Sequence, residues 1–241
     1  MKRFILVVVT TVGLTTASAS VPVSALGEVQ VTLSCTDGDT ASDVTYVVDS
    51  TQLLELKDAV EAIALYPAGL TCSIAEAPLT SLFGLVAVAA DGPQDTALGG
   101  GIFIDTRGAG CATLVPFNPT GAVHVHMNVD AHVAADASAP AFGHFMERVV
   151  EPGNPCNGDS RRATVYCLTV TGNRADLRST QTSFSGTYEP GAQPLGWRGT
   201  DGQPKPDYTY SAQGDTVACP TTSGGAPTLF LLQGSIVITD R

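Results

Sequence analysis

The sequence has little charge and few aromatic side chains. Charged residues make up 15% and aromatic residues 6% of the 241 residues, and the whole chain has only three lysines. A helical bundle needs many long charged side chains on its outer faces, so this composition argues against one. Valine, threonine, glycine and alanine are common instead, and they favour strands and turns. We therefore expect a mainly β protein.

The chain has no apolar run of about 18 residues after its N-terminus, the length that a membrane-spanning helix needs. The N-terminus itself has the order of a secretory signal peptide. Lys2 and Arg3 precede an apolar stretch at 4–14, and small residues end at Ala19. This order predicts a signal peptide over residues 1–19, with a second acceptable cleavage site after Ala25; a buried strand or helix is the alternative. We expect a secreted, extracellular protein without a membrane span.

Basic residues are too few for a nucleic-acid-binding surface. Without residues 1–19 the chain has ten Lys and Arg against 23 Asp and Glu, a formal net charge of −13. Such a field repels phosphate backbones. The only adjacent bases, Arg161 and Arg162, fit the start of a strand. The expected partner is an extracellular ligand or protein, not a nucleic acid, and no cofactor is indicated.

The rest of the chain is expected to divide into a small and a larger unit. Residues 26–76 predict a ββαβ unit, because two β-rich segments flank an acidic turn and a helical apolar pattern follows from Thr51. Pro67 and Gly69 end that helix. The expected strands of this unit are 29–35, 44–48 and 70–74.

Residues 77–96 are expected to form a connector or a strand, and residues 97–241 a larger antiparallel β-sandwich or barrel. Short strands recur there without crossover helices between them. Gly172-Asn173 predicts a tight hairpin, and 189–227, rich in Pro, Gly, Asp and Gln, predicts a long surface loop. The expected strands are 101–105, 111–117, 123–129, 142–150, 163–170, 174–182 and 235–240.

Six cysteines, an even number, predict three disulfide bonds in an oxidising compartment. No C-x-x-C pair is present, so the usual spacing of a zinc-thiolate site is missing. The first expected bridge joins two cysteines of the small unit. A bridge between Cys156 and Cys167 is rejected because these two residues would lie too far apart along a hairpin. The predicted pairs are Cys35 with Cys72, Cys111 with Cys156, and Cys167 with Cys219.

Three local patterns carry a resemblance to known proteins. They are Gly99-Gly100-Gly101, the stretch 167–175 (CLTVTGNRA) and the closing stretch 234–240 (GSIVITD). In this order they resemble a group of secreted bacterial β-domain proteins with a post-COAP-type β domain, over about residues 97–241. The unit with Asp37-Gly38 and the stretch 65–72 (LYPAGLTC) also resembles a module found beside such domains. The resemblance implies a secreted β domain and carries over no activity, cofactor or catalytic residue.

The segment 123–132 (VHVHMNVDAH) is the most chemically suggestive. Alternation along a strand places Val123, Val125, Met127 and Val129 on one face and His124, His126, Asn128 and Asp130 on the other. Two histidines two residues apart can share a metal ion, with Asp130, His132 or His144 as a third ligand. The alternation is equally explained by an amphipathic strand with a polar outer face, and this interpretation is preferred. The metal site of His124, His126 and Asp130 is the alternative.

Three other motifs have simpler structural explanations. Gly158-Asp159-Ser160 lacks a following histidine that could serve as a base for a serine nucleophile. Asp37, Asp39 and Asp43 offer oxygens for calcium, but Asp and Gly are also what a tight turn requires. Trp197 fits a packed anchor better than a sugar-stacking platform.

No motif names a catalytic residue, so an enzyme is not the preferred interpretation. The sequence favours a secreted non-enzymatic domain for extracellular binding, adhesion or envelope association, because a rigid β framework with long loops suits recognition. The first alternative is a metal-dependent secreted enzyme centred on His124 and His126. The second is an inhibitor of extracellular proteases.

Overall fold

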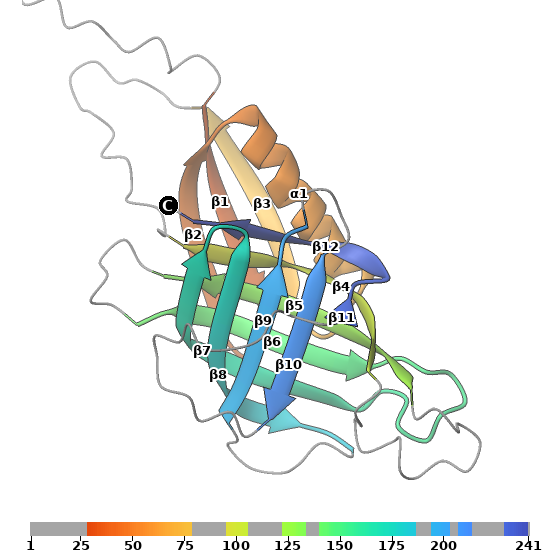
Figure 1. The fold of residues 1–241 in the computed structure, drawn as a ribbon. Coiled ribbons are helices and arrows are strands. Elements are labelled where there is room, and N and C mark those ends of the chain that lie inside the picture. The colour runs from red at the N-terminus through yellow and green to blue at the C-terminus, as the bar shows by residue number, and fades with distance from the viewer. Residues whose placement is uncertain are drawn as a thin grey trace, which may run out of the picture.

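The computed structural model describes residues 28–78, 95–105, 122–133, 140–186, 194–202, 207–213 and 229–240. These residues form a three-stranded sheet, a nine-stranded antiparallel sheet and one helix, α1 (Figure 1). The predicted mainly-β fold, with a small ββαβ unit before a larger antiparallel β structure, is confirmed. The signal peptide over residues 1–19, most of the connector or strand expected at 77–96 and the strand expected at 111–117 lie outside the described residues.

The small unit contains β1 (Val29–Thr36), β2 (Ala41–Val48), α1 (Ser50–Leu65) and β3 (Thr71–Pro78), with the strands in the order β2-β1-β3. The β1–β2 turn is held by the Asp37 carboxylate, whose Oδ1 accepts the N–H groups of Asp39 and Thr40 at 2.9 and 2.8 Å. These bonds favour the turn explanation of the acidic motif over calcium binding. The helix begins at a reciprocal capping box formed by Asp49 and Gln52.

A disulfide bond joins Cys35 to Cys72, which face each other across the paired strands β1 and β3. This predicted bridge is confirmed. Cys156 and Cys167 each also belong to a disulfide bond. Cys111 and Cys219 lie outside the described residues, so the pairings predicted for them remain predictions.

The nine-stranded sheet curls until its two edges meet. β11 and β12 follow each other along the chain but lie at opposite ends of the strand order β11-β10-β9-β8-β7-β6-β5-β4-β12. Between them, the N–H of Leu231 donates to the Asp207 carbonyl and the N–H of Leu232 to the Ile102 carbonyl. The strands are β4 (Thr96–Asp105), β5 (Val123–His132), β6 (Phe142–Val149), β7 (Ser160–Thr171), β8 (Arg174–Phe184), β9 (Pro194–Thr200), β10 (Tyr208–Gln213), β11 (Leu229–Phe230) and β12 (Gln233–Thr239).

The prediction of a long loop over 189–227 is wrong for the two segments that form β9 and β10. Trp197 on β9 is fully buried, and its indole Nε1–H donates to the Thr209 hydroxyl at 2.8 Å. A Cβ atom at Gly199 would lie 2.2 Å from the Trp197 ring, so glycine leaves the space that this ring fills. Pro194 is the first residue of its strand, where proline is tolerated. Gly199, which contributes to the loop-like composition, therefore allows the Trp197 ring to pack. Trp197 is a packed anchor, as expected.

The small unit packs on the outer face of the curled sheet, which gives the protein two apolar cores. One lies inside the curl. The other lies between the sheet and the small unit and includes Leu33, Ile63, Leu98 and Met146. A Cβ atom at Gly100 would lie 2.9 Å from the Cα atom of Ile63. The triple-glycine motif thus lets α1 approach β4 at backbone distance.

Candidate functional site

Strand β5 carries the residues that the sequence singled out. Its first face is core as predicted, since Val123, Val125, Met127 and Val129 are at most 1% exposed and pack inside the curl. Its second face points to the small unit. The expectation of a polar outer face is wrong for the second half of the strand, where Asn128, Asp130 and His132 are fully buried. Strand alternation predicts the faces, but it does not predict which of them another unit covers.

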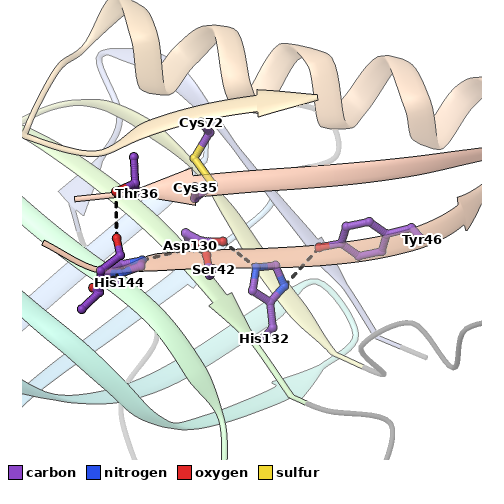
Figure 2. The surroundings of a disulfide bond; sticks show 9 residues. Cys35, Thr36, Ser42, Tyr46, Cys72, Asp130, His132 and His144 are labelled. Atoms are coloured by element: carbon purple, nitrogen blue, oxygen red, sulfur yellow. Dashed lines mark hydrogen bonds and ion pairs between the residues drawn. A yellow bond between two sulfur atoms is a disulfide. The ribbon is translucent and has the colours of Figure 1, made fainter. Parts of the chain in front are cut away.

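Asp130 is the centre of a buried polar cluster (Figure 2). Its Oδ1 accepts a hydrogen bond from Nε2 of His132 at 2.5 Å, and its Oδ2 accepts one from the Ser42 hydroxyl at 2.5 Å. Nδ1 of His132 lies 3.1 Å from the Tyr46 hydroxyl. Ser42 and Tyr46 lie on β2, whereas Asp130 and His132 lie on β5. The cluster therefore ties the small unit to the large sheet.

His144 on β6 extends the cluster toward the β1–β2 turn. Its Nδ1 lies 3.4 Å from Oδ2 of Asp130, and its Nε2 lies 2.8 Å from the Thr40 hydroxyl. That hydroxyl also lies within hydrogen-bond distance of the Asp37 carboxylate, at 3.2 Å. A continuous chain of polar contacts thus links Asp130 to the turn, and both ring nitrogens of each histidine are engaged.

The charged form of Asp130 is strongly favoured. Burial by itself would raise the pKa of this carboxyl, because the charged form loses its hydration. The positive charge and hydrogen bond of His132, together with hydrogen bonds from His144 and Ser42, outweigh burial and hold the pKa well below its ordinary value. Asp130 is therefore a carboxylate at neutral pH, and its charge is compensated inside the protein.

This geometry joins a carboxylate, two imidazoles and three hydroxyls, which are groups that many catalytic sites use. A catalytic base must reach a substrate proton, directly or through one water molecule. Here Asp130 and His132 are fully buried and His144 is 4% exposed, and all their ring and carboxylate atoms face protein partners. The cluster is arranged to hold two layers together.

His124 and His126 lie apart from that cluster, on the first half of β5. Nδ1 of His124 pairs with the Glu151 carboxylate at 2.8 Å, and this hydrogen bond lowers the pKa of Glu151. The ring of His126 meets that of Tyr66 edge-on, with centroids 5.7 Å apart. Burial and then the nearby charge of Arg148 lower the pKa of His126. Arg148 faces His126 across the strand pair and disfavours a divalent cation there.

The three residues of the metal alternative are thus divided between two environments. Asp130 bonds to His132, whereas His124 bonds to Glu151. In the described ranges, no group of three or more His, Cys, Asp or Glu residues is arranged to hold a metal ion. The serine of the Gly158-Asp159-Ser160 motif begins β7, and its hydroxyl lies 3.2 Å from that of Ser185.

Replacing both His124 and His126 by alanine is expected to change the melting temperature little, with or without a chelator. Both side chains are only half-buried. Met127→Ala on the opposite face is the matched comparison and should lower the melting temperature clearly, because Met127 is fully buried. Thermal denaturation of the three proteins measures both effects. A chelator that destabilises the parent protein but not the double variant would contradict the prediction.

Sequence reasoning missed the partners that β2 supplies. Ser42, Val44, Tyr46 and Val48 alternate along β2, and all four are buried. The sequence predicts a strand over 44–48 only, and two of these four buried residues carry hydroxyls on an otherwise apolar face. Hydroxyls on a buried face need hydrogen-bond partners, so this signal was available. The identity of the partner, Asp130, depended on how the two units pack.

Two cavities open beside α1. The first, of about 300 Å³, lies between the start of α1 and the end of β12; Tyr46, Thr96 and Glu55 are among its lining residues. The second, of about 380 Å³, lies between the end of α1 and the start of β12; Glu61 and Leu65 are among its lining residues. Both are of a size that accepts small ligands or single side chains.

The chain matches no protein-family model, no curated protein and no solved structure. Its resemblance to secreted post-COAP-type β domains therefore remains a prediction. None of the helices in the described part of the chain is long and apolar enough to span a membrane.

Proposed function

We propose that this chain is a secreted, non-enzymatic domain that binds a ligand or protein outside the cell or in its envelope. The observation that carries the proposal is a contrast between two sites. The Asp130 cluster, which holds the most reactive groups, is enclosed and fully engaged, whereas the cavities beside α1 are open. A closed polar junction stabilises a framework, and open cavities on a rigid framework suit recognition.

Three further features support an extracellular setting. The N-terminal segment has the order of a signal peptide. The Cys35–Cys72 disulfide is of the kind that persists in oxidising compartments. The net charge of −13 expected after cleavage at Ala19 would keep such a protein dispersed outside the cell.

A metal-dependent enzyme centred on His124 and His126 is the second candidate. One observation favours it: Nδ1 of His126 is buried and has no hydrogen-bond partner among the described residues. A neutral imidazole nitrogen of this kind can bind a metal ion. The guanidinium of Arg148 nearby and the engagement of His124 by Glu151 weigh against it.

The test uses the protein secreted by its own cells, with its N-terminus determined by mass spectrometry. We expect a chain that begins at Ser20 and sediments saturably with isolated envelope material, unchanged by a chelator. A charge-reversed variant at the first cavity, Glu55→Lys, should sediment less. Absence of saturable binding would contradict the proposal. Stoichiometric zinc, lost together with a hydrolytic activity in the His124→Ala, His126→Ala double variant, would establish the second candidate instead.

A further inference from the structure

We propose that the first cavity, between the start of α1 and the end of β12, binds a primary ammonium group on a short aliphatic chain. The group can come from a lysine side chain or from a free amine. This inference rests on the binding function proposed above and names the chemistry of one ligand. It is carried by the walls of the cavity, by one buried hydroxyl and by the charges of the lining residues.

The walls of the cavity suit a short aliphatic body. The cavity volume of about 300 Å³ is at the lower end of small-molecule sites. Tyr46 adds an aromatic ring, and rings attract ammonium groups. The apolar lining residues come from β2, α1 and β12 and are Val48, Leu56, Val237 and Ile238.

Thr96 supplies a buried polar group in this cavity. It is 3% exposed and lines the cavity. On β4 it alternates with Leu98 and Gly100, which face the small unit, so its side chain points to that same side. The Thr96 hydroxyl forms no hydrogen bond with any of the described residues, and its oxygen is not completely enclosed by protein atoms. Since buried hydroxyls are normally paired, this oxygen is available to accept an N–H from a ligand.

The charges of the lining residues select a cation. Glu55 on α1 and Asp240 after β12 contribute two carboxylates, and none of the described residues that line the cavity is a lysine, arginine or histidine. Glu55 has no hydrogen bond or ion pair with any of the described residues. Asp240 accepts the N–H of Gly172 through Oδ2 at 2.6 Å, which fixes it at the rim. An ammonium group offers three donors to these oxygens, whereas an anionic ligand would be repelled.

The experiment measures binding to the full chain by amide NMR shifts, with Gly172 and Thr239 as reporters. The two amine probes are Nα-acetyl-lysine N-methylamide for a lysine side chain and 1-aminopentane for a free amine. Nα-acetyl-norleucine N-methylamide, which lacks only the amino group of the lysine probe, is the uncharged analogue, and pentanoate is the anionic counterpart. We expect saturable shifts with at least one amine and none with the norleucine analogue or pentanoate. The amine that binds more tightly identifies the source of the group.

Three variants locate the site. Thr96→Val keeps the shape of the side chain and should weaken amine binding about tenfold, because a hydrogen bond to a charged group is lost. Glu55→Gln should weaken it about two- to fivefold, as expected for an exposed carboxylate. Glu61→Gln is the matched control: it also removes a carboxylate from α1, but from the second cavity. It should leave the affinity unchanged.

Three outcomes would overturn the inference. They are no saturable shift with either amine, equal shifts with the norleucine analogue, or equal weakening by Glu61→Gln, which would indicate general attraction to an acidic surface. If Thr96→Val fails to fold, the comparison of Glu55→Gln with Glu61→Gln still decides. Envelope sedimentation is a separate measurement. Saturable sedimentation without amine binding would refute this site and leave the proposed function intact.

Discussion

Replacement of Asp130 by asparagine is expected to lower the free energy of unfolding by about 3 to 5 kcal/mol, the range for removal of one partner from a buried ion pair. Asp130 accepts hydrogen bonds from His132, His144 and Ser42 in a site with no solvent access. Without the carboxylate, the buried His132 ring loses its charged hydrogen-bond partner. The amide can also accept fewer of these bonds.

Urea denaturation of the variant and the parent protein measures this difference. Asp58→Asn is the matched control, because the same atoms change on an exposed position of α1. Its effect should stay within about 0.5 kcal/mol, as for most surface substitutions. A loss at Asp130 no larger than that of the control would show that the cluster does not hold the two units together.

The lowered pKa of Asp130 predicts how the stability of the protein changes in acid. The pKa of Asp130 is lower in the folded protein than its unfolded value of about 3.9. Its stabilisation is therefore fully present above about pH 4 and is lost as the pH falls further toward the folded-state pKa. In Asp130→Asn this part of the acid dependence should be missing, so the two stability curves should converge below pH 4. Parallel curves over that range would contradict the assignment.

The sequence predicts local structure well where one signal dominates. The helix followed from its apolar spacing and its stop at Pro67, and it ends at Leu65. The bridge between Cys35 and Cys72 followed from a small unit with two cysteines. Both features depend on residues that are near one another in the chain or in one unit, so a local pattern was sufficient to predict them.

The polar cluster could be predicted only in part. Alternation placed Asp130 on the polar face of its strand, but its contact with Ser42 joins residues 88 positions apart. That contact depends on how α1 and β2 lie on the curled sheet, and this packing depends in turn on the small size of Gly100. Likewise, the sequence does not predict β9, because Gly199 makes room for the Trp197 ring and composition alone suggests a loop for such a segment. In both cases the outcome depends on packing between elements of the fold, which a local sequence pattern does not specify.

The second large effect is expected from the double variant Cys35→Ser, Cys72→Ser. The bridge closes a segment with a sequence separation of 37 that contains β2 and α1. On the chain-entropy estimate, its loss should lower the free energy of unfolding by about 4 kcal/mol. Cys35 is 1% exposed and belongs to the core between the two units, so the buried serine hydroxyl adds to the cost.

The disulfide and the Asp130 cluster should also depend on each other. The bridge ties β1 to β3, whereas Ser42 and Tyr46 reach the large sheet from β2, which pairs with β1. A small unit loosened by loss of the bridge holds these hydroxyls less firmly against Asp130. The cysteine and Asp130→Asn variants combined should therefore cost less than the sum of their separate effects, as for sites that share one interface. Urea denaturation of the four proteins tests this, and strict additivity would show that the bridge stabilises the small unit without affecting its attachment to the large sheet.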